Sequence, residues 1–240
     1  MFLFYRLLLA HLIGDFVLQT NKVFAFKSRS VWGVFFHASI IFLVSILLSW
    51  PYLSYPLMWA ILFLIWISHF IADQAKVSIT KKFDNLGIFL LDQVLHIGIT
   101  SVIFLTGLSK IKLTISGDSF LPFLYNEDKI ILCLIGYIIA TFGAAILIYY
   151  LKRSLLGEER AALDFSPATR QLGLVERFFI TTFVILGGFY FFLIPVVFLS
   201  EVITSSKNTP EEQADKIFYS SMISIAIAIL IGLWLKRVLA

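Results

Sequence analysis

Charge, cysteine and linker-like segments are all scarce in this sequence. Only 14% of its 240 residues are charged, whereas about 25% is usual for a soluble domain. The 60% of apolar residues excludes a disordered chain and is too high for a soluble globule. The single cysteine, Cys133, lies in an apolar run, which excludes a disulfide framework or a thiolate metal site. What remains is an all-α integral membrane protein.

The apolar residues fall into about seven runs that are long enough to form membrane-spanning helices. These runs cover residues 2–20, 31–50, 56–75, 86–108, 129–151, 178–200 and 217–235. The first four contain all the histidines, and the last three contain no Asp, Glu, His or Arg. We therefore predict a site-bearing four-helix bundle in residues 1–110 and a three-helix membrane domain in residues 111–240.

Lysine and arginine are distributed unevenly between the two ends of these spans. Of the 19 basic residues, 13 follow spans one, three, five and seven, and 6 lie on the other side. The positive-inside rule then places the N-terminus outside and the C-terminus in the cytoplasm. The largest cytoplasmic connection is residues 152–177, in which Ser166 and Pro167 predict a helix start. Gly187 and Gly188 permit a bend in the sixth span. The net charge of +4 indicates topology and not nucleic-acid binding, so membrane lipids are the expected partners.

Seven aspartate and histidine residues lie inside the first four spans. Three of the histidines stand four residues from an aspartate, a spacing that puts both side chains on one helix face. Since successive spans run in opposite directions, all seven lie roughly 5–15 Å inside the same, cytoplasmic membrane face. The set is His11, Asp15, His37, His69, Asp73, Asp92 and His96.

The arrangement repeats along the chain. His11 and His69 are 58 residues apart, as are Asp15 and Asp73, and His37 precedes His96 by 59 residues. Spans one and two and spans three and four therefore form two parallel hairpins related by a pseudo-two-fold axis along the membrane normal. The repeat is broken at Gly33, which stands where the second hairpin has Asp92.

Buried aspartates are costly in a membrane, about 2.5–3.5 kcal/mol each at mid-helix, and a bound cation offsets that cost. Mixed His and Asp ligands suit Zn, Mn or Fe. Seven ligands are too many for one tetrahedral ion, so we expect two divalent metal ions, or one with surrounding hydrogen-bond partners. Neutral partners are available in Gln19, Gln74 and Gln93, and rim lysines in Lys22, Lys27 and Lys76. These lysines are suited to an anionic headgroup or a phosphate, although lysines that snorkel and fix topology are the simpler interpretation.

Four of these segments together resemble a bacterial membrane family of the DUF3307 type, a domain of unknown function. They are His11-Leu-Ile-Gly-Asp15-Phe-Val-Leu-Gln19, His37, His69-Phe-Ile-Ala-Asp73-Gln-Ala-Lys76 and Asp92-Gln93-Val-Leu-His96. The segment Gly173–Ile180 resembles a Gly-x-x-Glu-Arg element of longer members. The resemblance implies a multi-pass protein of the bacterial inner membrane and no particular activity. The family is distantly similar to membrane proteins labelled metal-dependent hydrolases.

Three functions are compatible with this pattern. The leading hypothesis is a metal-dependent hydrolase at the cytoplasmic leaflet, acting on a lipid-linked or phosphate-containing substrate, with a water activated by the metal as nucleophile. In this hydrolase hypothesis, His37 is a seventh ligand or a proton-transfer group. The second is a divalent-metal or proton transporter, against which stands the lack of ionisable groups beyond His37 and His96 in their spans. The third is a structural membrane subunit in which the polar cluster sets helix register.

Overall fold

The computed structural model describes residues 1–80, 84–117, 120–156, 167–197 and 211–240. Throughout these ranges the regular structure is helical. The chain divides into two compact units, Met1–Ile135 and Gly136–Ala240, which are described separately below. The predicted division at residue 110 stays a prediction.

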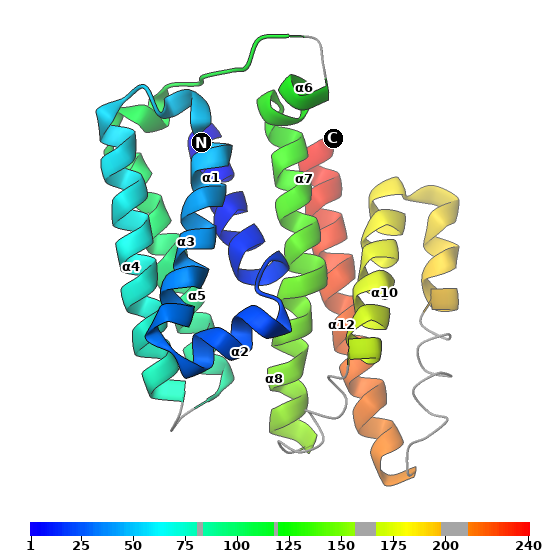
Figure 1. Ribbon diagram of the computed structural model, residues 1–240. Coiled ribbons are helices and arrows are strands. Elements are labelled where there is room, and N and C mark those ends of the chain that lie inside the picture. The colour runs from blue at the N-terminus through cyan, green and yellow to red at the C-terminus, as the bar shows by residue number, and fades with distance from the viewer. Residues whose placement is uncertain (81–83, 118–119, 157–166, 198–210) are drawn as a thin grey trace. The chain divides into compact units, whose positions relative to one another are not determined.

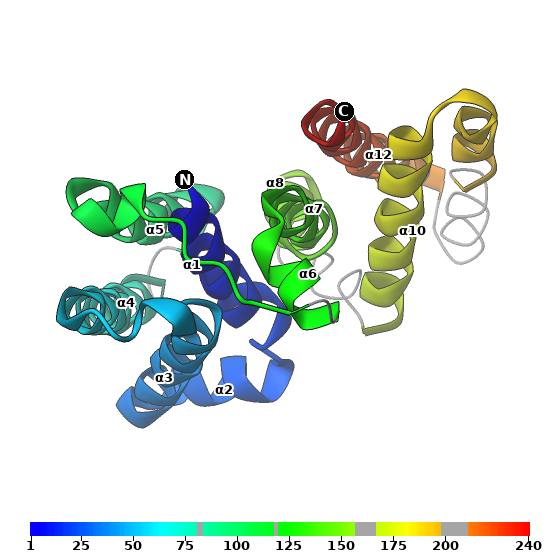
Figure 2. The same cartoon turned by 90° about the horizontal axis from the view of Figure 1, so that it is seen from above.

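In unit 1 the helices α1, α3, α4 and α5 stand side by side, and α2 runs across their ends (Figure 1). Each upright helix contacts two neighbours, in the ring order α1, α3, α4 and α5, as the view from above shows (Figure 2). The crossing helix, α2, packs against α3. The bounds are α1 Phe2–Leu12, the π-helix η1 Ile13–Val17, α2 Asn21–Arg29, α3 Val31–Leu48, α4 Pro56–Thr80 and α5 Leu86–Thr100. Short 3-10 turns η2 (Trp50–Tyr52), η3 (Ser101–Leu105) and η4 (Gly107–Lys110) follow α3 and α5, and α6 (Phe120–Asn126) precedes α7 (Asp128–Ile138).

The helices confirm an all-α membrane protein. Five are long and apolar enough to cross a bilayer: Val31–Leu48, Pro56–Thr80, Leu86–Leu105, Asp128–Leu151 and Ser221–Leu239. Phe2–Val17 and Asn21–Arg29 together make a sixth candidate, bent by 88°. The described residues thus contain five or six candidate spans, and the count of seven stays a prediction.

Side-chain caps explain where the crossing helix and its neighbours begin. Thr20 Oγ1 accepts a hydrogen bond from Val23 N at the start of α2, and Ser30 Oγ accepts one from Trp32 N at the start of α3. Asn85 Oδ1 does the same for Ile88 N in α5. These residues satisfy backbone donors that a helix start leaves unpaired. Thr20 and Ser30 thereby make α2 a separate element at the end of the predicted first span.

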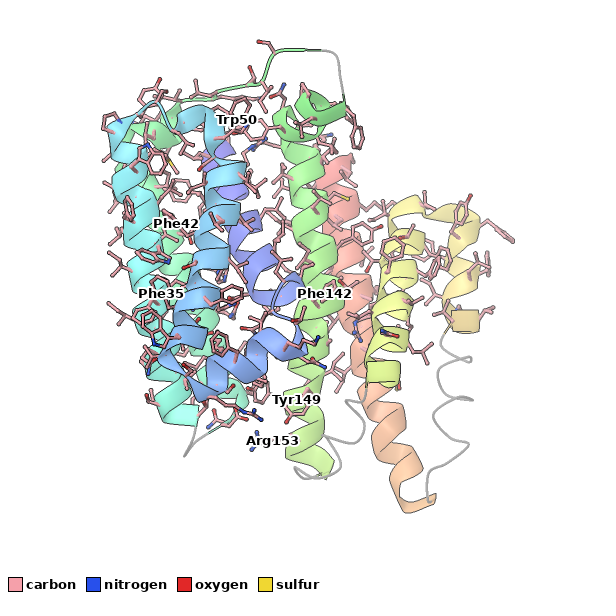
Figure 3. All side chains as sticks on the ribbon, in the orientation of Figure 1. Phe35, Phe42, Trp50, Phe142, Tyr149 and Arg153 are labelled. Carbon is pink, nitrogen blue, oxygen red and sulfur yellow. The ribbon has the colours of Figure 1, made fainter. Side chains whose placement is uncertain are left out.

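Unit 1 has an apolar core on the far side of the histidines from α2. Leu3, Leu7, Leu62, Ile65 and Ile103 belong to this buried cluster. An aromatic seam joins α3 to α4, since Phe35 and Phe42, labelled in Figure 3, lie with ring centroids 5.4 and 5.5 Å from that of Trp66. Packing of this kind holds α3 and α4 as one hairpin.

A buried arginine closes the end of unit 1 away from α2. The Arg6 side chain is fully buried and contacts Asp128 Oδ1 at 2.5 Å. It also donates hydrogen bonds to the carbonyl oxygens of Phe2 and Tyr125, and its guanidinium lies 3.2 Å from the centroid of the Phe2 ring. Arg6 therefore ties the start of α1 to α6 and α7.

Unit 2 contains the π-helix η5 (Ile139–Gly143), α8 (Ala144–Leu156), α10 (Pro167–Leu186) and α12 (Glu211–Leu239). Helix α10 is described from Pro167 on, and the predicted helix start at Ser166 lies partly outside the described residues. It stops at Leu186 because Gly187 and Gly188 adopt φ values of 68° and 57°, which favour glycine. A 3-10 turn, η6 (Gly188–Leu193), follows. The predicted sixth span is therefore broken at the bend that its two glycines permit.

The predicted connection 152–177 is partly helical. Residues 152–156 belong to α8 and residues 167–177 to α10. Glu176 and Arg177, the last two residues of the Gly-x-x-Glu-Arg element, are buried. Arg177 Nη1 donates a hydrogen bond to Ser224 Oγ of α12 at 3.0 Å. This element thus helps to pack α10 against α12.

Candidate metal centre

All seven predicted site residues meet in the interior of unit 1. His11 comes from α1 and Asp15 from η1, His37 from α3, His69 and Asp73 from α4, and Asp92 and His96 from α5. Each is buried, with at most 6% of its surface exposed. Four helices that are far apart in sequence therefore deliver their ionisable side chains to one place.

The histidines present their Nε2 atoms to carboxylates of their own helix and of neighbouring helices. His37 Nε2 lies 3.0 Å from Asp15 Oδ1, and His69 Nε2 lies 3.4 Å from the same oxygen. His69 Nε2 is 3.2 Å from Asp73 Oδ2, and His96 Nε2 is 3.3 Å from Asp92 Oδ1. The His69 and His96 rings stack with centroids 3.9 Å apart. The contacts form one continuous cluster instead of three isolated pairs.

Asp15 owes its position to a π-helical turn. The predicted partner, His11 in the same helix, is 3.8 Å away, farther than His37 or His69. A π-turn inserts an extra residue into the helix and is frequent at functional sites. Gly14 allows this turn to pack closely, because a Cβ there would lie 2.2 Å from Ile41 Cγ1. The turn therefore directs Asp15 toward α3 and α4.

Three imidazole nitrogens indicate whether a metal ion fits the cluster. The Nε2 atoms of His11, His69 and His96 are buried and have no hydrogen-bond partner among the described residues. Three overlapping groups of residues could each hold a metal ion, since within each group the ligand atoms lie within 4.8 Å of one another. The groups are His11, Asp15 and His69; His37, His69 and Asp73; and Asp15, Asp92 and His96. Buried polar atoms without partners are costly, and a cation is the partner that both imidazole and carboxylate accept. The donor set fits a metal ion.

Lysine and glutamine side chains lie around the carboxylates. Lys27 Nζ is 2.8 Å from Asp73 Oδ1 and donates to Gln19 Oε1 at 3.1 Å. Lys76 Nζ is 2.6 Å from Asp92 Oδ2. Gln93 Nε2 donates to Asp15 Oδ2 at 3.3 Å and to Asp92 Oδ2 at 3.1 Å. Four of the predicted surrounding residues, Gln19, Lys27, Lys76 and Gln93, are therefore connected to the site.

The two other predicted surrounding residues are placed differently. Lys22 is exposed on α2, so the structure does not bring it into the cluster. Gln74 follows Asp73 in α4, and its Oε1 atom is buried with no hydrogen-bond partner in the described part of the chain. His37, predicted as a seventh ligand or a proton-transfer group, has a short contact to Asp15 from another helix, at 3.0 Å.

Lys27 is the residue whose place the sequence did not indicate. We expected it at the rim, yet only 6% of its surface is exposed. Gly33 explains the difference, since a Cβ there would lie 2.1 Å from the carbonyl oxygen of Phe26. The backbone of α2 thus rests directly on Gly33, and Lys27 enters the site from α2. The amphipathic stretch between the caps Thr20 and Ser30 is the signal that indicates such a helix.

Comparison with known proteins identifies the part of the chain that contains this centre. Residues 3–121 match the family described as "Protein of unknown function (DUF3307)". Residues 3–121 belong to this family. The DUF3307 region includes all seven clustered residues and Lys27, whereas the Gly-x-x-Glu-Arg element lies outside it. Neither a curated protein nor a solved structure matches the chain. Similarity to metal-dependent membrane hydrolases stays a prediction.

Proposed function

We propose that the chain is a metal-dependent membrane hydrolase whose His/Asp cluster binds one or two divalent ions. The single observation that carries this proposal is the convergence of three buried Nε2 atoms, which lack a hydrogen bond in the described part of the chain, with three buried aspartates. Zn, Mn and Fe suit such mixed ligands. In this proposal the substrate is lipid-linked, because the cluster lies inside a membrane bundle, or contains phosphate, because Lys27 and Lys76 lie beside the cluster.

Each group has a role in such a centre. Asp15, Asp73 and Asp92 together with His11, His69 and His96 would hold the ions, which when bound polarise the scissile bond and activate water. His37 contacts Asp15 at 3.0 Å, so it is placed to orient that carboxylate and to take up a proton. The apolar helices around the cluster exclude bulk water.

The proposed location is the cytoplasmic leaflet of the bacterial plasma membrane, with the N-terminus outside and the C-terminus inside. The excess of lysine and arginine on one side supports this orientation. In this orientation, α2 and the lysine-bearing end of the site lie on the cytoplasmic side.

The first test is metal content. We expect the full chain, purified in detergent, to contain a stoichiometric transition metal, and Asp73→Asn and His96→Ala to lose it. Outer partners of metal ligands are worth about 10–100-fold in affinity, so removal of a ligand should cost at least as much. Asp84→Asn, in the loop before α5, is the control carboxylate. A folded, metal-free wild type would contradict the proposal and favour a structural subunit.

The reaction itself is tested on lipid phosphate mono- and diesters in mixed micelles. Release of phosphate or alcohol should require added metal and should disappear in Asp73→Asn. Metal binding without turnover of any ester would contradict the hydrolase activity and show only a metal-binding membrane protein.

Transport is the competing function, and the apolar core argues against it. Leu7, Ile65 and Ile103 lie one or two helical turns beyond His11, His69 and His96 and belong to the buried apolar cluster. A polar path across unit 1 would have to pass through these side chains. Flux of metal ions or protons into proteoliposomes would overturn this argument.

A further inference from the structure

Two lysines reach the candidate metal centre from the end of unit 1 that carries α2. Lys27 approaches from α2 and Lys76 from α4, one helical turn beyond Asp73. Their ammonium groups contact Asp73 Oδ1 at 2.8 Å and Asp92 Oδ2 at 2.6 Å. These carboxylates also face His69 and His96, whose Nε2 atoms have no hydrogen-bond partner among the described residues. A metal ion and the two ammoniums would therefore compete for Asp73 and Asp92.

Charge balance shows what such competition requires. Three carboxylates and two ammoniums leave one negative charge when the imidazoles are neutral. One divalent ion changes that balance to one positive charge, and two ions change it to three. Unbalanced charge is expensive in an apolar bundle. A metal-loaded site thus needs an anion, and the lysines released from their aspartates are the nearest cations to hold it.

We propose that metal uptake displaces Lys27 and Lys76 from Asp73 and Asp92, and that the two ammoniums then bind the phosphate group of the substrate. This inference rests on the proposed metal site and narrows its substrate to phosphate-bearing molecules. Lysine suits the role because its charge sits on a flexible four-carbon stem and binds phosphate well. A phosphate dianion also offsets the positive charge that the metal adds.

The proposal predicts opposite effects of one substitution on two ligands. Lys27→Met removes a competitor for Asp73, so metal should bind more tightly in the full chain. The same variant should bind phosphate about 10–100-fold more weakly when loaded with metal, the loss expected for one charge-assisted hydrogen bond. Lys76→Met should behave in the same way. Arg29→Met, an exposed basic residue of α2, is the matched control and should change neither affinity.

Titration calorimetry of the detergent-solubilised protein separates the outcomes. The probes are Zn²⁺ or Mn²⁺ alone, then inorganic phosphate and short-chain phosphatidic acid with metal present. Binding of both phosphate probes supports recognition of the phosphate group itself, and binding of phosphatidic acid alone supports a lipid headgroup. A variant that loses both metal and phosphate shows a structural lysine and overturns the inference.

Failure of this inference is distinguishable from failure of the proposed function. If wild-type protein binds no metal, the metal site itself is absent. If metal binds normally while Lys27→Met leaves metal affinity unchanged, or while phosphate binds equally well without metal, the lysine exchange is wrong and the metal site stands.

Discussion

Every buried Asp, His, Lys and Arg side chain in the described part of unit 1 lies within 4.0 Å of an acidic or basic partner. Lys27 and Lys76 contact Asp73 and Asp92, Arg6 contacts Asp128, and each histidine lies within 4.0 Å of a carboxylate. Such pairing is what allows charged residues to exist inside a membrane bundle. The same pairs that permit folding are therefore the groups that a ligand would have to rearrange.

Arg6 offers a test of this pairing away from the candidate centre. Its side chain is fully buried, whereas that of Asp128 is 37% exposed. Asp128→Asn leaves the guanidinium without its counter-charge, and we expect the free energy of unfolding to fall by about 1–3 kcal/mol. Thermal unfolding in detergent measures the change.

The double variant Arg6→Met with Asp128→Asn supplies the control for this prediction. It removes both charges, so it should recover much of the lost stability, as neutral replacements of buried pairs often do. Equal melting of Asp128→Asn and wild type would show that Phe2 and Tyr125 alone hold Arg6.

Among the elements, the helices of unit 1 show what periodicity and alternation can predict. The spacing of His69 and Asp73, and of Asp92 and His96, places each pair on one face of a helix. The alternating direction of the spans then brings all of them to one end. Both inferences use only geometry that every α-helix shares, so they anticipated the meeting of the seven residues.

Departures from regular helix geometry were beyond those inferences. The π-turn at Ile13–Val17 breaks the register on which the four-residue spacing of His11 and Asp15 depends. The first span was predicted over residues 2–20, but in the structure it ends at Val17 and α2 turns away by 88°. Hydropathy could not predict this bend, since it contains no information on the direction of a helix. Lys27 enters the site because α2 packs directly on Gly33. Such a contact depends on the tertiary packing of two helices, which the sequence pattern alone does not give.

Gly33 makes the position of α2 testable. In Gly33→Ala the new Cβ would meet the Phe26 carbonyl oxygen at 2.1 Å, so α2 must shift and withdraw Lys27 from Asp73. We expect a loss of about 1–3 kcal/mol in stability, the range for overpacked sites. Hydrogen exchange of the amides of residues 21–29 should become faster.

Gly98 in α5 is the matched glycine, because a Cβ there meets nothing within 4 Å. Gly98→Ala should be neutral or stabilising by up to about 1 kcal/mol, and exchange in α2 should stay unchanged. Unchanged exchange in Gly33→Ala as well would contradict the close contact between α2 and α3.

For the whole molecule, metal binding should appear as added stability. A ligand at 100 times its Kd stabilises the state that binds it by about 2.7 kcal/mol, so chelation should lower the unfolding midpoint of the full chain. The chelated protein should remain folded, because Lys27 and Lys76 neutralise two of the three carboxylates.

Asp73→Asn provides the comparison, since its unfolding midpoint should not respond to the chelator. A response of equal size in wild type and Asp73→Asn would place the stabilising ion elsewhere in the chain.

The length of the first helix has a consequence for the bilayer around the whole protein. The 11 residues of α1 and the 5 of η1 rise roughly 24 Å, whereas a hydrocarbon core is about 30 Å thick. The neighbouring α3 has 18 residues, and the other neighbouring span, Leu86–Leu105, has 20. None of the residues of α1 is exposed, so the shortfall falls on α2, which bears the exposed Phe24 and Phe26 and is expected to lie in the interface between headgroups and acyl chains.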